Sequence, residues 1–286
     1  MGLELRRGTP ADASECGQVC FEAFKAIADR HAFPRDFPSP EAASSVLSFL
    51  LSHPKFHSTV AEHEGRIVGS NFLDERCSTI AGVGPISVDP SAQGKGVGRR
   101  LMTEALERAR ARNFGGIRLV QVSYNNQTLC LYSRLGFRTR EPLSLVNGPP
   151  PKAALAGYAV RPAQPPDIEP CNHICRAVHG HDRSGELEEA VAAGTAKVVE
   201  YQGRITGYAT AIGFFTHAVS ENDAGLMALI GAADQIAGPG LLVPTRNHTL
   251  FTWCLDHGFK LVQQMTLMTI GLYNEPSGAY LPSVLY

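Results

Sequence analysis

The sequence predicts an α/β protein built from two tandem units of the same fold. Its 286 residues are enough for two ordinary domains. Segments typical of strands and of amphipathic helices alternate along the chain. A segment rich in proline and alanine divides the chain, and the order of elements before it recurs after it. We therefore expect one domain over 1–147, a linker over 148–157 and a second domain over 158–286.

The composition indicates a packed protein and argues against several classes of partner. Hydrophobic residues make up 44% of the chain, charged residues 19%, and the formal net charge is −1. No lysine- or arginine-rich run points to nucleic acid or an anionic membrane, and no apolar run is long enough to span a membrane. The seven cysteines lack the spacing of a disulfide framework, and the start does not resemble a signal peptide. We expect a cytoplasmic protein.

The first half shows clear signals for the ends of its elements. Thr9 and Pro10 are typical of a helix start, and Glu64-Gly65 is typical of a hairpin turn. Gly136 stands where a short helix should end. Strands are expected over 3–7, 58–64, 66–75, 84–88, 117–122 and 137–146, and helices from residue 10 and over 42–51, 97–112 and 126–135.

The second half repeats these signals in the same order, which favours a duplicated domain. Both halves also carry a C-x-x-x-C pair one helical turn apart. Because these pairs match the apolar faces of helices, we interpret them as core cysteines and expect no metal. The matched segments are 5–6 and 160–161, Cys16/Cys20 and Cys171/Cys175, 60–69 and 198–207, 126–129 and 247–250, and 135–137 and 257–259.

A glycine-rich loop lies between a predicted strand and a predicted helix. The run 88–101 reads V-D-P-S-A-Q-G-K-G-V-G-R-R-L, with glycines at 94, 96 and 98. The backbone N–H groups of such a loop, together with the unpaired donors of the helix N-terminus, form a cradle for a di-anion such as pyrophosphate. Glycine allows a phosphate to approach the backbone closely.

The spacing of the glycines distinguishes this loop from two other phosphate-binding motifs. It is neither the G-x-G-x-x-G of a dinucleotide fold nor a Walker loop. The run V-x-P-x-x-Q-G-x-G-x-G resembles the acetyl-CoA signature of the GNAT superfamily of acyl-CoA N-acyltransferases. A glycine-rich turn that holds no ligand is the alternative interpretation.

The resemblance implies a fold, an activity and a set of contacts with the cofactor. The fold is two tandem GNAT-like domains, each a mixed, mostly antiparallel central sheet flanked by helices. The co-substrate is acetyl-CoA, whose pantetheine amides pair with a strand that splays from its neighbour, while the loop holds the pyrophosphate. The cofactor-binding residues expected on this basis are Ile86, Ser87, Val88, Gln93, Gly94, Lys95, Gly96, Val97, Gly98, Arg99 and Asn126.

The same resemblance implies that Tyr132 is catalytic. It lies four residues before Gly136 in a segment similar to the family's N-x-x-x-x-x-Y-x-x-x-G-F, where the tyrosine is the general acid for the leaving thiolate. A phenol is protonated at neutral pH and can donate that proton. A packing role for Tyr132, and a helix-capping role for Asn126, are the alternatives. The general base stays open among Asp74, Glu75, Ser123 and Tyr124, or the amine arrives neutral.

The second half lacks the cradle. Its corresponding segment, 216–225, has fewer glycines and carries Glu221 and Asp223, which would repel a phosphate. We expect this half to keep the fold without the cofactor site. Residues 178–183 have no counterpart in the first half, and Arg183, His181 or Asp182 is a candidate for lining an acceptor pocket between the halves. A polar surface loop is the other interpretation.

Together these observations predict an N-acetyltransferase that moves an acetyl group from acetyl-CoA to an amine of a small molecule by direct transfer. The expected partner is the small-molecule amine, with no nucleic acid, membrane or metal involved, and a homodimer is left open. A non-catalytic CoA-binding sensor or scaffold is one alternative, and a protein or peptide N-acetyltransferase is another. In a further variant the second half supplies catalytic groups. The acceptor itself is not evident in the sequence.

Overall fold

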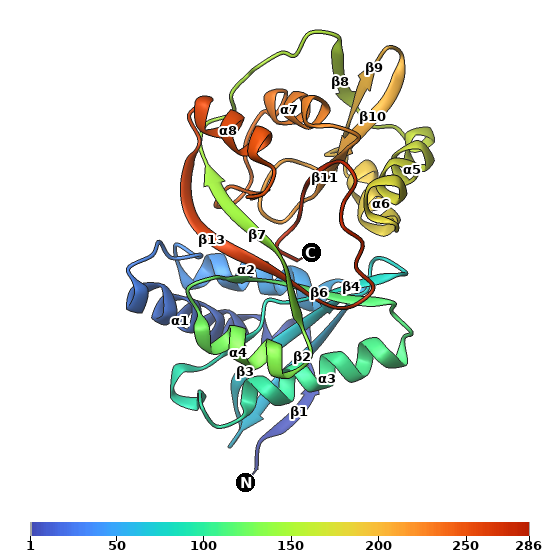
Figure 1. Ribbon diagram of the computed structural model, residues 1–286. Helices are drawn as coiled ribbons and strands as arrows, with labels where there is room; N and C mark the ends of the chain where they lie inside the picture. Colours follow the sequence, from blue (N-terminus) through green and yellow to red (C-terminus); the bar gives the residue numbers. More distant parts are fainter. Residues whose placement is uncertain (1, 286) are drawn as a thin grey trace.

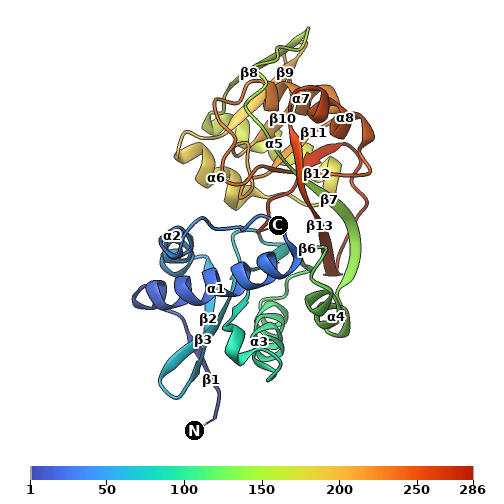
Figure 2. The ribbon, with the colours of Figure 1, turned by 90° about the vertical axis from the view of Figure 1, so that its left-hand side faces the viewer.

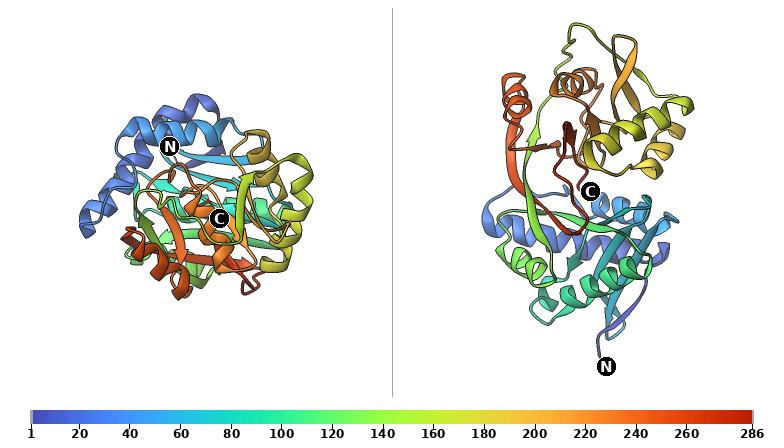
Figure 3. Two further views of the ribbon diagram at one scale, coloured as in Figure 1. Left: turned by 90° about the horizontal axis from the view of Figure 1, so that it is seen from above. Right: turned by 45° about the vertical axis from the view of Figure 1, so that its right-hand side comes forward.

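The computed structural model describes residues 2–285 and has two lobes (Figures 1 and 3). The first lobe contains β1 (Glu4–Arg7), α1 (Ala13–His31), α2 (Pro40–Ser52), β2 (Phe56–His63), β3 (Arg66–Asp74), β4 (Ile80–Val83), β5 (Ser87–Val88), α3 (Val97–Ala111), β6 (Gly116–Val122), α4 (Asn126–Arg134) and β7 (Arg138–Asn147). The second half contains β8 (Tyr158–Pro162), α5 (Ile168–His179), α6 (Ser184–Ala192), β9 (Lys197–Tyr201), β10 (Arg204–Ala209), β11 (Ala218–Ser220), α7 (Asp223–Gly231), β12 (Leu241–Pro244), α8 (His248–Asp256), β13 (Lys260–Gly271) and β14 (Ala279–Leu281).

The duplicated sequence produces the same local contacts in both halves. In the first half the guanidinium of Arg6 donates to Asp12 at 2.8 Å and to Glu62 at 2.9 Å, which ties the first strand to the start of α1 and to β2. The counterpart of Arg6, Arg161, donates to Asp167 at 2.6 Å and to Glu200. These partners hold the pKa of Asp12 near 2 and lower that of Asp167.

The two halves exchange their long final strands. The first sheet runs β1-β2-β3-β4-β6-β13-β7-β12, so β13 of the second half lies between two strands of the first half. It pairs antiparallel with β6 from Met265 opposite Val122 to Gly271 opposite Gly116. In return β7 pairs with β12 of the second half. Figure 1 shows β7 and β13 side by side, joining the two lobes.

The exchange bears on the predicted domain boundaries. Each half keeps its own helices, but the first sheet contains β12 and β13 from beyond the 148–157 segment. The second sheet, β14-β11-β10-β9-β8, belongs wholly to the second half. A cut at the linker would therefore divide a hydrogen-bonded sheet. The boundaries 1–147 and 158–286 describe the repeat in the sequence, and as domain boundaries they stay a prediction.

Helices cover both faces of the first sheet (Figure 2). Helices α1 and α2 pack their apolar residues on one face, and α3 and α4 pack theirs on the other. The predicted core cysteines are buried in these apolar layers: Cys16 and Cys20 under α2, and Cys171 and Cys175 in the core of the second half. Within residues 2–285, no helix combines the length and the apolar character that a membrane crossing requires.

Candidate active site

The glycine-rich loop adopts a conformation that requires glycine. Gly94 has φ +77° and Gly96 has φ +86°, both in the left-handed region. A Cβ on either residue would meet no heavy atom within 4 Å, so this loop faces open space. The Gln93 side chain donates to the Val88 carbonyl at 3.1 Å and fastens the loop to the end of β5. The predicted cradle is therefore held in place and accessible.

Helix α3 begins at Val97, as the sequence predicts, and leaves its first donors free for an anion. Its N-cap is Gly96, which has no side chain that could satisfy the first N–H groups of the helix. The positive end of the helix dipole lies at the same point. Arg99 is exposed beside it, whereas Arg100 donates to the Leu3 carbonyl at 2.7 Å. Of the two arginines, Arg99 is the better placed to add charge.

The strand before the loop diverges from its neighbour. β4 pairs with β6 only from Ile80 opposite Gly116 to Gly82 opposite Arg118. After a turn at Gly84-Pro85, β5 pairs with β3 alone, with Val88 opposite Gly69 and Ser87 opposite Ser70. Among residues 2–285 no strand pairs with the other side of β5. We use the term free edge for residues 86–88, whose backbone has no partner strand on the side away from β3.

Tyr132 is buried on α4, in the apolar cluster against which Ile86 of the free edge also packs. It is 5% exposed and packs edge-on against Phe137, with 6.1 Å between ring centroids, in the apolar layer that contains Met102 and Leu106. Burial raises the pKa of Tyr132 above its ordinary value, so the phenol keeps its proton at neutral pH. This state suits a general acid.

The cap of α4 is Asn125 and not its neighbour Asn126. The Asn125 side chain accepts the Thr128 N–H at 3.2 Å. Asn126 is exposed at the first helical position, so the capping alternative for Asn126 is wrong. Its contact with the cofactor stays a proposal. The helix ends before Gly136, at φ +97°, as predicted.

Two of the four candidate bases are engaged in ion pairs. Asp74 is bonded to Arg76 at 2.6 Å, and Glu75 is bonded to Arg108 at 2.7 Å. The hydroxyl of Ser123 lies 2.8 Å from that of Thr266 on β13. The Tyr124 hydroxyl, in contrast, is buried without a hydrogen-bond partner in the described chain. Asp36, a half-buried carboxylate near Tyr124, is not among the predicted site residues, because its proline-rich setting gives no signal of burial.

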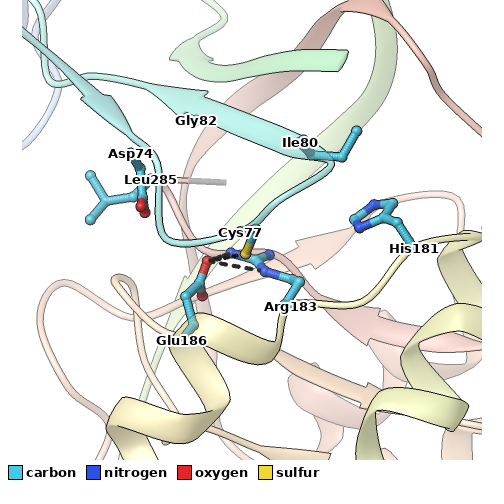
Figure 4. Close-up of a pocket in the computed structure, with 8 residues that line it drawn as sticks. All are labelled: Asp74, Cys77, Ile80, Gly82, His181, Arg183, Glu186 and Leu285. Carbon is cyan, nitrogen blue, oxygen red and sulfur yellow. Dashed lines mark hydrogen bonds and ion pairs between the residues drawn. The ribbon is translucent and has the colours of Figure 1, made fainter. Parts of the chain in front are cut away.

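Residues 181–183 lie between the two halves, but they do not form an acceptor pocket (Figure 4). His181 and Arg183 line a cavity of about 10 Å³, which has room for a water molecule. Arg183 is bonded to Glu186 at 2.5 Å, and Asp182 pairs with Arg176 at 3.0 Å. Both ion pairs lie within the second half, and Glu186 reaches the first half through Arg76, 3.8 Å away. Within residues 2–285, no group of three or more histidine, cysteine or acidic side chains could hold a metal ion.

The second half presents no free edge at the corresponding position. Ser220 on β11 lies opposite Gly207 on β10, the register that Val88 has with Gly69. On its other side β11 pairs with β14, with Ser220 opposite Ala279. The chain's own C-terminal segment thus occupies the edge that stays unpaired in the first half.

A hollow of about 450 Å³ remains beside the N-terminus of α7, and its charge is acidic. Four carboxylates and one arginine line it, and that arginine, Arg246, is bonded to Glu141 at 2.6 Å and to Glu275 at 2.9 Å. The predicted acidic residues Glu221 and Asp223 belong to this lining. Such a surface repels phosphates.

Comparison with known proteins gives the family. The model of the acetyltransferase (GNAT) domain matches residues 54–139. N-alpha-acetyltransferase RimI of Mycobacterium tuberculosis is 33% identical over 134 residues, which are 46% of this chain and 75% of that protein. Mycothiol acetyltransferase of Thermomonospora curvata is 35% identical over 92 residues, 32% of this chain. This second match spans only 31% of the relative's length.

Solved structures agree on the fold across the whole chain. A crystal structure from Pyrococcus horikoshii covers 100% of this chain and 93% of its own, with a TM-score of 0.72 and 17% identity. A tandem GNAT protein from the clavulanic acid biosynthesis pathway covers 94% of this chain and 98% of its own, with a TM-score of 0.56 and 15% identity. The chain belongs to the GNAT family of acetyltransferases and has the tandem architecture.

Proposed function

We propose that this protein transfers an acetyl group from acetyl-CoA to the amine of a small molecule, with the first half holding the thioester. The observation that supports the proposal is the free edge, residues 86–88, lying directly before the open loop and the uncapped start of α3. A pantetheine arm needs backbone partners in an extended geometry, and a pyrophosphate needs converging N–H groups. Both lie in one continuous segment.

The proposed contacts follow from this arrangement. The N–H groups of residues 93–98 take the pyrophosphate, and Arg99 adds positive charge. The backbone of the free edge pairs with the amides of the arm, and Asn126 contributes a polar contact. Hydrogen bonds from a backbone fixed in a sheet and a helix cost little reorganisation when the cofactor enters.

Tyr132 completes the chemistry at the thioester. As the amine nitrogen forms its bond to the carbonyl carbon, the carbon–sulfur bond breaks and its electron pair stays on sulfur. The Tyr132 hydroxyl donates its proton to that sulfur. Because burial keeps the phenol protonated, the acid is ready at neutral pH.

Transfer to a protein or peptide N-terminus is the second candidate. It is favoured by the match to a relative named as an N-alpha-acetyltransferase. A non-catalytic CoA sensor is the third reading, and the presence of a buried, protonated tyrosine at the expected place weighs against it.

Calorimetry on the full chain with acetyl-CoA tests the proposal. The variant is Gly96→Asp, which places a carboxylate in the cradle, and the control is Gly203→Asp. Gly203 also has positive φ and open space around its Cβ position, but it lies in a hairpin of the second half. We expect Gly96→Asp to weaken binding at least tenfold, by roughly 1.4 kcal/mol or more, and Gly203→Asp to bind as the parent.

Thiol release over a panel of small amines and peptides then separates the three readings. Turnover of small amines supports the proposal, and turnover of peptides alone favours the second candidate. Binding without release on any amine favours a sensor. Absence of heat with acetyl-CoA would overturn all three.

A further inference from the structure

The loop between α1 and α2 buries a carboxylate against a strand of the second half. Asp36 lies in this loop, and its Oδ1 accepts a hydrogen bond of 3.4 Å from Nε2 of Gln263. Gln263 is on β13, is 3% exposed and stands at a register shift in the pairing with β7. Such irregularities re-aim side chains and are frequent next to active sites. Burial raises the pKa of Asp36 to about 6, offset in part by Gln263, and no lysine or arginine contributes to that shift.

Two further acceptor atoms lie in the same cluster. The Gln263 Oε1 and the Tyr124 hydroxyl are both buried without a hydrogen-bond partner in residues 2–285. The Tyr124 ring stacks on Phe33 at 4.2 Å between centroids and 7° between planes, which fixes its position. Burial and the nearby charge of Asp36 raise the pKa of Tyr124 to about 12. Buried polar atoms without a hydrogen bond are unfavourable, so the cluster is suited to receive a donor.

Helix α1 links the loop of Asp36 to the strand that carries the free edge. Cys20 lies on α1, which packs against β5. Burial raises the pKa of its thiol, the charge of Asp36 raises it further, and Ser87 partly offsets both. Ser87 belongs to β5, the strand that carries the free edge. Asp36, in the loop that follows α1, and the free edge on β5 are therefore both neighbours of this helix.

We propose that Asp36, Tyr124 and Gln263 bind the amino group of the acceptor and that Asp36 is the general base. The inference rests on the proposed function. An ammonium has three N–H donors, and the cluster supplies a carboxylate, a hydroxyl and an amide oxygen to accept them. Three elements provide these groups, one of which, β13, comes from the second half.

Asp36 takes one proton from the ammonium, and the neutral amine attacks the thioester carbon. The carbon–sulfur bond breaks, sulfur keeps the electron pair, and Tyr132 protonates it. The phenolate of Tyr132 regains a proton from the new amide nitrogen, and Asp36 releases its proton to water. The net products are the amide, the free thiol and one proton.

The charge of the cluster also defines the class of acceptor. Since no lysine or arginine of the described residues, 2–285, contributes to the shift of the Asp36 pKa, an acceptor with a carboxylate next to its amine would bring two negative charges together. The preferred acceptors are therefore primary amines without an adjacent carboxylate. Free amino acids are disfavoured, and their amides are accepted.

The test compares alanine, serine and phenylalanine with their amides, in the parent and in Asp36→Asn. The parent should acetylate the amides with at least a tenfold higher kcat/KM than the acids. Asp36→Asn should lower kcat/KM for the amides roughly 100-fold and narrow that preference, while its acetyl-CoA affinity stays within twofold. The same substrates, with the same amine pKa values, are given to both enzymes. A change in the preference for amides over acids therefore reports the effect of Asp36.

Two variants show where the effect originates. Tyr124→Phe should raise KM for the amides more than it lowers kcat. The control Asp234→Asn, which changes an exposed carboxylate paired with Lys197, should behave as the parent. A parent that binds acetyl-CoA but acetylates no amide, or an Asp36→Asn enzyme with unchanged kcat/KM, overturns the inference and leaves acetyl-CoA binding intact. A parent that does not bind acetyl-CoA overturns the proposed function instead.

Discussion

Ser220 pairs with Ala279 on the side away from β10, whereas Val88, in the same register within its own half, has no strand in residues 2–285 on the side away from β3. The two positions come from matching parts of the sequence repeat. One is closed by the chain's own C-terminal segment and the other is open. This difference, together with the acidic hollow beside α7, supports the proposal that only the first half holds the cofactor.

The first prediction concerns stoichiometry. Calorimetry should give one acetyl-CoA per chain, because only the first half combines a free edge with an uncapped glycine loop. Gly96→Asp should weaken that single site and expose no second one. A stoichiometry of two would show that the cofactor can displace β14 from its pairing with β11.

The second prediction concerns the general acid. Tyr132→Phe removes the only proton that Tyr132 can donate and keeps the ring that packs against Phe137. We expect kcat to fall roughly 100-fold with little change in acetyl-CoA affinity. Tyr201→Phe, at an exposed tyrosine of the second half, is the matched control in steady-state assays. Equal kcat values for the two variants would remove Tyr132 from the mechanism.

The third prediction concerns truncation after Asn147. The fragment lacks β13, so β6 and β7 lose the strand that joins them, and two hydrophobic edges are exposed. We expect aggregation or a broad, non-cooperative melt, measured by size-exclusion chromatography and circular dichroism. A fragment that melts cooperatively and binds acetyl-CoA as the parent does would show that β7 can pair directly with β6.

The fourth prediction concerns stability against pH. His217 donates from Nδ1 to Glu186 at 2.8 Å and accepts from the Tyr208 hydroxyl at 3.0 Å, which suits the neutral ring. Burial, aided by the charge of Arg183, lowers the pKa of His217 to about 4, against about 6.5 in the unfolded chain. As the pH falls from about 6.5 to 4, His217 binds a proton in the unfolded state but stays neutral in the folded state. Stability should therefore fall across this window, by roughly 1–3 kcal/mol.

Thermal melts between pH 4 and 7 measure this effect, with His217→Gln as the comparison. Glutamine keeps a donor for Glu186 and has no proton to gain, so its melting temperature should vary less over the window. Burial also lowers the pKa of His181 to about 4, so the melting temperature of His217→Gln should still fall in part as the pH falls. A parent whose melting temperature rises as the pH falls from 6.5 to 4 would contradict the assignment of a neutral ring.

Much of the fold could be predicted from local sequence. The start of α3 at Val97, the end of α4 before Gly136 and the repeated arginines Arg6 and Arg161 are each set by residues within one or two turns. Glycine conformation, helix ends and amphipathic spacing are short-range properties. They were sufficient to find the candidate cofactor loop.

The strand exchange could not be predicted, for a physical reason. β7 and β13 come from matching parts of a duplicated sequence, so each has the hydrophobic pattern that suits a place beside β6 or beside β12. Local pattern does not choose between the two pairings, and the packing of the whole chain decides. Asp36 was missed for a related reason, since its burial depends on Gln263, which is remote in sequence.

The position of β13 also sets the order in which activity can arise during synthesis. The strand beside β6 leaves the ribosome only after nearly all of the second half has been translated. Until then the nascent first half carries its cofactor loop, but β6 lacks its partner and Asp36 lacks Gln263. We therefore expect acetyl transfer to begin only after β13, the last major strand, has joined the sheet.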